Sequence, residues 1–563
     1  MNSIRAKQVC SLWFAILIYC YEEVGHASIP DPTSSAVHAG PTAFLILSSK
    51  VEPWFAAGII GNDRSAGFLQ RLRESGTNGN MLAEGFLGML LVTGDGVTPD
   101  KAEGLHLLHR SAEQGCLPAM GELGYVYLEG RFGVPTNRTE ALKWIRSAAD
   151  RGWANAQCNL GYCCERGLGI EVDLVEAAKW YRLAADQGHP AAKGSLGVFY
   201  MEGRGGITPD HTLAERLLRE AVEKGNIRAK LNLGYLYVEK GYRTNMFETG
   251  IRLIREAAEA GDFRAQAHLA HLYFYGNGLP KDLTNYLAWT RKAAEQGLAE
   301  AQLNMANALG AGKITNRNLA EARQWSEKAA HQGLPEACFI FANMLARGDG
   351  GEKDTVQAVE WFNKAATQGH RAAQFRLALA YWSGDGVKTN IAEGTRWIRI
   401  SAEGGWPMSE FTFALCLLNG QNGVTKSTQE GVRWLRKAAE DECLEAQSVL
   451  GIKLIKGVDL PRDSTEGIKW FRRAAEHGYG KAQNDLGYAI ETEEGGSGDL
   501  VEACAWYLLA VKGGIGPAAK ANAERLVRKL DQEQLAEVMR RVQNFKPNPV
   551  PELNPPIEKR LEK

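Results

Sequence analysis

Apolar residues recur at spacings of three and four along most of the chain, a pattern typical of amphipathic helices. The stretch Ala156–His189, AQCNLGYCCERGLGIEVDLVEAAKWYRLAADQGH, contains two such runs separated by a turn with two glycines. Stretches of the same design begin at Ala301 and Ala372. The pattern therefore predicts an all-α fold made of pairs of short helices joined by glycine turns.

Tryptophan marks the length of this unit, because nine of the 14 tryptophans occupy one recurring position. Their spacing is 36 or 37 residues, and Leu217 and Leu253 stand at the two positions where the tryptophan is replaced. The nine are Trp144, Trp180, Trp289, Trp325, Trp361, Trp397, Trp434, Trp470 and Trp506. A period in this range indicates a solenoid. We count about twelve helix-turn-helix units of 36–37 residues, and we expect the tryptophans to fill the space between helix pairs.

The other recurring positions also have a packing or capping role. Each unit begins with a small residue, and Leu-Gly or Leu-Ala follows four and five residues later. The aspartates Asp173, Asp282 and Asp354 precede the second helix, where a carboxylate can accept hydrogen bonds from free backbone amides. Gly188 and its equivalents follow the second helix and are expected to end it.

These motifs resemble the Sel-one-like repeat family, which is related to the tetratricopeptide repeats. Within that family, the chain resembles the exported subgroup. The resemblance implies a right-handed α-solenoid that acts as an adaptor or scaffold in protein–protein interactions. Exported bacterial members act in the cell envelope and in host contact, and a eukaryotic branch acts in the endoplasmic-reticulum lumen.

The two ends of the chain differ from the repeats. Residues 1–27 have a positive start, an apolar core of ten residues and small residues before a cleavage point, which is the layout of a secretory signal peptide. Residues 28–80 form an N-terminal segment that includes a degenerate capping unit. The repeat array extends over 81–516, two charged amphipathic helices over 517–545 are expected to cap it, and the proline-rich residues 546–563 are expected to be a disordered tail. We therefore expect an exported protein, periplasmic or secreted, or resident in the secretory pathway of a eukaryote.

Charge and hydropathy argue against nucleic-acid binding and against a membrane-spanning segment. The formal net charge is −1, and no basic run occurs, so the sequence argues against a nucleic-acid binder. The apolar core of residues 1–27 is too short to span a membrane, and the sequence predicts no transmembrane segment.

The adjacent cysteines Cys163 and Cys164 occupy positions that other units fill with large core side chains. We interpret them as small hydrophobic residues, because no second cysteine cluster supplies the remaining ligands of a zinc site. Export would permit a disulfide, and a bridge among Cys116, Cys158, Cys163 and Cys164 stays open, with a connectivity that the sequence does not define.

The sequence contains no recognisable catalytic motif. The histidine pairs His106–His109 and His268–His271 each lie on one helix face, but no further ligand is evident, so we predict neither a metal nor a cofactor. Some secreted relatives carry a beta-lactamase label, which leaves a secreted hydrolase as one alternative. A binder of cell-wall or other polysaccharide is another, because Trp, Tyr and Asn also suit sugars. We predict a protein that is not an enzyme.

The predicted partner is a protein or a peptide bound along the concave face, with cell-envelope or polysaccharide components as the alternative. The first helices should line this face, and polar residues off the packing positions should point into it. Asparagine can donate to and accept from a peptide backbone, and tyrosine provides contact area. The candidate binding row consists of Asn159, Asn232, Asn304, His268, Tyr125, Tyr162 and Tyr235.

Overall fold

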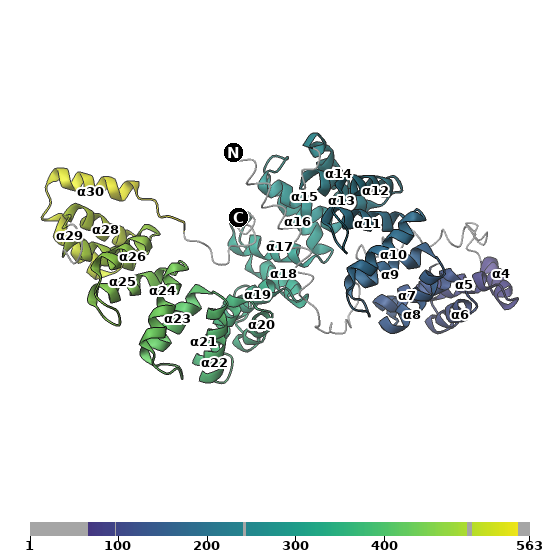
Figure 1. The fold of residues 1–563 in the computed structure, drawn as a ribbon, viewed down its shortest axis with the longest axis horizontal. Coiled ribbons are helices and arrows are strands. Elements are labelled where there is room, and N and C mark those ends of the chain that lie inside the picture. Colours follow the sequence, from purple (N-terminus) through teal and green to yellow (C-terminus); the bar gives the residue numbers. More distant parts are fainter. Residues whose placement is uncertain (1–65, 96, 240–243, 493–497, 550–563) are drawn as a thin grey trace. The chain divides into compact units, whose positions relative to one another are not determined.

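The computed structural model describes residues 66–95, 97–239, 244–492 and 498–549. Within these residues it contains 27 α-helices, α4 to α30, and no β-strand (Figure 1). This confirms the all-α solenoid of helix-turn-helix units that the tryptophan spacing predicts. The predicted signal peptide and most of the segment before α4 (Ala66–Thr77) lie outside the described residues.

The helices follow one another as pairs of nearly uniform length. The pairs are α5 (Met81–Thr93) and α6 (Lys101–Glu113), α7 (Leu117–Glu129) and α8 (Arg138–Asp150), α9 (Ala154–Arg166) and α10 (Leu174–Asp186), α11 (Pro190–Glu202) and α12 (His211–Glu223), α13 (Ile227–Val238) and α14 (Phe247–Glu259), α15 (Phe263–Tyr275) and α16 (Leu283–Glu295), α17 (Ala299–Ala311) and α18 (Leu319–His331), α19 (Pro335–Arg347) and α20 (Thr355–Thr367), α21 (Arg371–Ser383) and α22 (Ile391–Glu403), α23 (Pro407–Asn419) and α24 (Thr428–Glu440), α25 (Leu444–Lys456) and α26 (Ser464–Glu476), and α27 (Gly480–Glu491) and α28 (Leu500–Lys512). Two further helices, α29 (Pro517–Val527) and α30 (Gln532–Asn544), follow the last pair, and two short 3₁₀ turns lie at Arg131–Gly133 and Thr244–Met246.

The chain forms two compact units, residues 1–301 (unit 1) and residues 302–563 (unit 2), and the division falls within α17. In both units the two helices of a pair pack on each other, and the second helix packs on the first helix of the next pair. First helices of neighbouring pairs also contact each other, as α11 does α13 in unit 1 and α25 does α27 in unit 2. The first helices therefore form the inner layer of each unit, and the second helices form the outer layer.

The predicted capping aspartates are confirmed. Asp173 accepts a hydrogen bond from the backbone N–H of Glu176 at 2.9 Å, and Asp354 accepts one from Gln357 at 2.9 Å. Asp282 caps α16 through the backbone N–H groups of two residues. These bonds satisfy amides that the first turn of a helix leaves without an intrahelical partner.

The spacing of the two turn glycines has a steric cause, which is clearest after α21. Gly384 ends that helix with φ +77°, a left-handed conformation that glycine adopts at little cost. Gly386 also has φ +77°, and a Cβ atom at this position would lie 2.1 Å from the carbonyl oxygen of Thr355 in the preceding pair. The second glycine therefore lets the turn touch the start of α20.

The recurring tryptophans lie where one helix pair meets the next, a contact surface that we call the seam. Trp361 of α20 is 6% exposed, and its ring packs edge-on against His331 of the preceding pair at 5.1 Å and Phe341 of its own pair at 5.6 Å. The Lys364 ammonium lies 3.6 Å from the centre of the same ring. A packed aromatic under a cation combines burial with cation–π attraction. Five of the nine are buried, Trp144, Trp325, Trp361, Trp397 and Trp506, and four are half-buried, Trp180, Trp289, Trp434 and Trp470.

A glutamine that the sequence analysis did not single out also crosses the seam. Gln447 of α25 is fully buried and donates from Nε2 to the carbonyl oxygen of Ala439 in α24 at 2.9 Å. Gln157 makes the equivalent bond to Ala149 at 3.2 Å and accepts one from Gln187 at 2.7 Å. The residue recurs directly after the small residue at the start of many units, so the sequence does carry its signal. Gln157, Gln266, Gln374, Gln447 and Gln483 all donate to a carbonyl oxygen eight residues earlier.

The C-terminal end of the array is covered by residues outside the repeats. Helix α30 packs on α28, and the ring of Phe545 lies edge-on to that of Trp506 at 5.7 Å. Asn548 then donates its backbone N–H to the carbonyl oxygen of Glu476 at 2.8 Å. Residues 546–549, the start of the segment expected to be disordered, are thus bound to α26, and the remainder of that segment lies outside the described residues.

Candidate functional site

One stripe of each first helix is turned away from the helix pairs. If the small residue at the start of the unit is position 0, as Ala156 is in α9, positions 0, +4 and +8 pack into the core. At roughly 100° per residue, positions −1, +3, +6 and +10 fall within about 60° of one another on the opposite side. We call this stripe the inner row, because it lies on the inner layer of helices.

Three asparagines at position +3 have unused hydrogen-bonding capacity. Asn159, Asn232 and Asn304 are half-buried on α9, α13 and α17. Their side chains make no hydrogen bond within the described part of the chain, whereas Asn343 at position +6 of α19 donates to the carbonyl oxygen of Phe339 at 2.9 Å. Each of the three amides therefore retains two donors and an acceptor for another molecule.

The predicted tyrosines at position +6 differ in their accessibility. Tyr125 and Tyr235 are each 2% exposed, so their rings belong to the packed wall of unit 1 and present little surface to a partner. The guanidinium of Arg131 covers the Tyr125 ring at 4.7 Å, and burial raises the pKa of Tyr125 to about 12. Tyr162 is half-buried, and burial raises the pKa of its phenol above the usual value. Of the three, Tyr162 is the one that can contact a partner.

The inner row also contains arginines that the sequence analysis did not consider. Arg228 and Arg264 stand at position −1 of α13 and α15, and Arg166 stands at position +10 of α9. The guanidinium groups of all three act on the phenol of Tyr162, and they favour its ionised form against the effect of burial. The helical geometry that places positions +3 and +6 on the inner row also places positions −1 and +10 there. Their electrostatic effect on Tyr162 depends on how the helix pairs stack, which the sequence does not show.

The predicted His268 belongs to a separate group on α13 and α15. Its Nε2 lies 3.4 Å from a carboxylate oxygen of Glu239, and its ring is edge-on to Tyr235 at 6.1 Å and stacked on His271 at 6.1 Å. Burial, with a smaller effect from His268, lowers the pKa of His271 to about 4. These rings pack into the wall of unit 1. In the other predicted pair, His106–His109, the ring of His109 is hydrogen-bonded to the Tyr127 hydroxyl at 2.9 Å.

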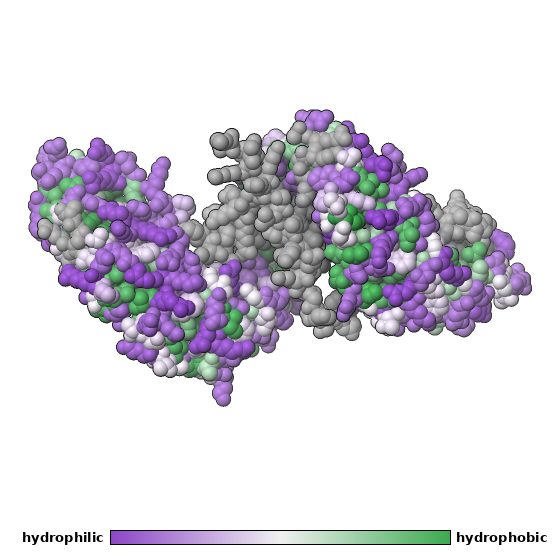
Figure 2. All heavy atoms as spheres, viewed as in Figure 1, coloured by the Kyte–Doolittle hydropathy of each residue, from purple (hydrophilic) through white to green (hydrophobic). Residues whose placement is uncertain are grey.

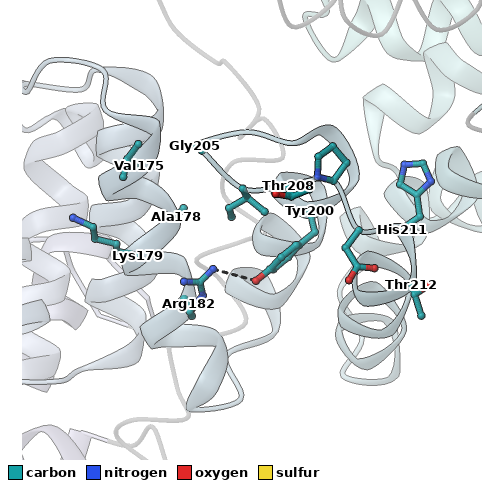
Figure 3. A pocket seen from close by; sticks show the side chains of 13 residues that line it. Val175, Ala178, Lys179, Arg182, Tyr200, Gly205, Thr208, His211 and Thr212 are labelled. Carbon is teal, nitrogen blue, oxygen red and sulfur yellow. Dashed lines mark hydrogen bonds between the residues drawn. The ribbon is translucent and has the colours of Figure 1, made fainter.

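A cavity of about 850 Å³ lies between α10 and the turn that leads from α11 into α12 (Figure 3). Its walls include Lys179, Arg182 and Tyr200, and the Arg182 guanidinium donates to the Tyr200 hydroxyl at 3.0 Å. Lys179 is paired with Glu176 at 3.0 Å. Since these two cations already have partners, the cavity offers less unused binding capacity than the inner row.

The eight cysteines in the described residues are all buried free thiols, so the bridges considered among Cys116, Cys158, Cys163 and Cys164 are not present in this structure. Burial raises the pKa of Cys158 and of Cys163 to about 12. A thiol in such surroundings packs as a hydrophobic residue and is a poor nucleophile.

Two further features are absent from the described residues. No group of three or more His, Cys, Asp or Glu side chains is arranged to hold a metal ion. No described helix has both the length and the apolar character needed to cross a membrane. Among the described residues on the face shown in Figure 2, polar side chains predominate and hydrophobic residues form separate patches.

The model of the Sel1 repeat family matches more than half of the chain. The matched segments are residues 82–116, 117–153, 154–189, 190–226, 263–298, 299–334, 335–370, 371–406, 411–442, 444–479 and 480–515. The chain belongs to the Sel1 repeat family. This confirms the resemblance to Sel-one-like repeats and places the protein among solenoids whose fold serves protein–protein interactions.

Two solved structures show what this Sel1 repeat protein is similar to. One is c5321, described as a protective antigen of uropathogenic Escherichia coli strains with an SLR fold. It is 30% identical over 85% of this chain and 94% of its own, with a TM-score of 0.53. The other is a Sel1 repeat protein from Oxalobacter formigenes, 32% identical over 56% of this chain and 90% of its own, with a TM-score of 0.47.

The family match leaves out residues 227–262, the unit with Leu253 in place of tryptophan. This unit nevertheless contains a helix pair, α13 and α14. Gly234 and Gly250 allow the two helices to approach closely, since a Cβ atom on either would lie within 2.9 Å of the other's carbonyl oxygen. The helix pair is therefore retained where the sequence motif is weak, and this unit supplies Asn232 and Arg228 to the inner row.

Proposed function

We infer that this Sel1 repeat protein is a non-enzymatic scaffold that binds a protein or peptide partner along the inner rows of its first helices. The observation that supports this most is the unused capacity of the half-buried Asn159, Asn232 and Asn304. A half-buried asparagine is more stable when its amide groups are hydrogen-bonded. A bound peptide backbone offers the C=O groups that accept from the side-chain NH₂ and the N–H groups that donate to the side-chain oxygen.

Recognition of this kind depends on many contacts of moderate strength. A typical hydrogen bond contributes about 0.5–1.5 kcal/mol net, so the affinity comes from several amides, from Tyr162 and from shape. No bond is made or broken in this function. The repeated spacing of the units suits an extended segment, because successive first helices present the same position at regular intervals.

The proposal includes export, either to the periplasm or medium or into the secretory pathway. It is supported by the signal-peptide layout of residues 1–27 and is in keeping with the protective-antigen description of c5321. A fusion of residues 1–27 to a reporter enzyme should leave the cytosol. Retention of this fusion in the cytosol would contradict export and leave the binding proposal intact.

Site-specific photo-crosslinking tests the binding surface in the native host. A photoreactive amino acid at position 159 should give a defined protein adduct, whereas the same group at Asn363, exposed on the outer helix α20, should not. Asn232→Ala should reduce the adduct formed from position 159 and leave the melting temperature nearly unchanged. Equal crosslinking from both positions, or a parallel loss of adduct and melting temperature, would refute the inner-row proposal.

A further inference from the structure

The cavity beside α10 has a filled counterpart one repeat further along the chain. Three of the residues that line the cavity have equivalents 37 residues later, at the same positions of the next repeat. The equivalent residues are Ala178 and Glu215, Arg182 and Arg219, and Tyr200 and Tyr237. The arginine and the tyrosine are thus repeated, whereas the glutamate of the second set is an alanine at the cavity.

In the filled counterpart the three side chains bind one another. Glu215 is 4% exposed, and its Oε1 accepts a hydrogen bond from the Tyr237 hydroxyl at 2.6 Å and lies 2.8 Å from Nη2 of Arg219. The same guanidinium donates to the Tyr237 hydroxyl at 2.9 Å. A carboxylate can be buried at this position because a cation and a phenol both stabilise its charge.

At the cavity, two of these three groups are in place and the carboxylate is missing. The Arg182 guanidinium donates to the Tyr200 hydroxyl at 3.0 Å, as in the filled counterpart (Figure 3). Within the described residues, neither side chain makes a further hydrogen bond or an ion pair. The phenol is neutral, so the charge of Arg182 has no counter-ion. The hydroxyl of Tyr200 accepts from Arg182 and retains its own hydrogen for donation.

The small side chain of Ala178 also leaves space under the turn. Ile251 stands at this position in the repeat after Glu215, and its Cδ1 would lie 2.4 Å from a Cβ atom on the turn glycine Gly278. Alanine does not extend to the turn in this way, and the cavity of about 850 Å³ lies beside it. Val175, which is 51% exposed, and the half-buried Ile207 provide apolar walls. The uncompensated cation is therefore next to apolar surface.

Two other charged groups in the wall already have partners. Lys179 is paired with Glu176 at 3.0 Å. Asp210 caps α12 by accepting from the backbone N–H of Leu213 at 2.9 Å. Because these two groups are engaged, Arg182 is the cation that remains for an anionic ligand.

We propose that this cavity binds the carboxylate of a small organic acid that has an apolar body. The ligand's carboxylate takes the place that the Glu215 carboxylate has in the next repeat, and it accepts from Arg182 and Tyr200. The apolar body lies against Val175 and Ile207. The cavity is built from second helices and a turn, so this site goes beyond the partner proposed for the inner rows.

Saturation-transfer NMR with hexanoate as the probe tests the site on the full chain. Hexanoate should receive saturation from the native protein, whereas hexanamide, which has the same apolar body without the charge, should receive far less. Ala178→Glu supplies the missing carboxylate from the chain itself and should abolish the hexanoate signal. Arg146→Gln is the matched control, because Arg146 has the position of Arg182 one repeat earlier, where Cys164 replaces the tyrosine.

Affinities for hexanoate then separate the two polar contacts. Arg182→Gln and, separately, Tyr200→Phe should each weaken binding on the order of tenfold, and Arg146→Gln should leave it unchanged. Ala178→Glu should melt no lower than the native chain, because the next repeat holds a glutamate at this position. A lower melting temperature would refute the equivalence with Glu215. The site is also wrong if hexanoate does not bind, binds no better than hexanamide, or binds these variants and the native chain equally.

Discussion

The seam and the inner row use the same helices in opposite ways. The seam repeats one solution in nearly every unit: a tryptophan or leucine, a buried glutamine or a small substitute, and a turn glycine that touches the preceding pair. The inner row changes from repeat to repeat: position −1 is Arg228 in α13 and Arg264 in α15, but Asn155 in α9 and Glu300 in α17. Repetition therefore supports the fold, and under the proposed function the departures from it determine which partner binds.

The largest expected effect comes from removing a seam tryptophan. Trp361→Ala should lower the free energy of unfolding by roughly 3–5 kcal/mol, because it leaves a cavity between α19, α20 and α18. Denaturant unfolding measures the loss. A change below about 1 kcal/mol would mean that the ring is not part of the packing between pairs.

A smaller loss is expected from the turn glycine that touches the preceding pair. Gly386→Ala should cost roughly 2–4 kcal/mol, because a left-handed alanine is strained and its Cβ atom would press on the Thr355 carbonyl oxygen. Gly369 also has a positive φ, but a Cβ atom there would meet nothing within 4 Å. Gly369→Ala should therefore cost less, and equal losses for the two variants would refute the steric role of the second turn glycine.

The buried glutamine should contribute less to stability than the seam tryptophan or the turn glycine. Gln447→Ala removes the donor to the Ala439 carbonyl oxygen and should lower stability by about 1–3 kcal/mol. Cys338 occupies the same position in α19, with a weaker contact from Sγ to the Ala330 carbonyl oxygen at 3.5 Å. Thermal unfolding of Cys338→Ala beside Gln447→Ala should show the smaller shift for the cysteine, and the reverse order would exclude a glutamine ladder as a stabilising element.

The buried cysteines Cys158 and Cys163 should be protected from thiol reagents in the folded protein. Because burial holds the thiol pKa of Cys158 and Cys163 near 12, a thiol reagent at pH 8 should react with the folded protein far more slowly than with the unfolded chain. Unfolded without reductant, the chain should titrate as ten thiols, or eight once residues 1–27 are removed. A deficit of two thiols would show a disulfide that this structure lacks.

The smallest loss of stability is expected from a substitution in the inner row. Asn304→Ala should change the free energy of unfolding by less than about 0.5 kcal/mol, since the side chain makes no hydrogen bond within the described residues. Denaturant unfolding run beside Trp361→Ala makes the contrast direct. A loss comparable to that of Gln447→Ala would show that the inner row is also structural, and the distinction between the two regions would disappear.

The sequence was sufficient for the fold because the fold depends on repetition. The tryptophan period, the capping residues and the turn glycines each recur, so one sequence shows each rule many times. The site was predictable only in part. Asn159 and Asn232 follow from helical geometry, but Tyr125 and Tyr162 share position +6 and differ in burial because their neighbours differ. The electrostatic effect of Arg166, Arg228 and Arg264 on Tyr162 depends on how the helix pairs pack, which no local pattern encodes.

The covering of Trp506 by Phe545, with α30 on α28, also closes the seam at the C-terminal end of the array. A seam left open at the end of a solenoid is a sticky edge that the first pair of another copy could occupy, and head-to-tail contacts of that kind grow into filaments. Helix α4 packs on α5 at the other end. The described ends of the array are thus covered by helices outside the repeats, and this covering disfavours end-to-end assembly of copies into filaments.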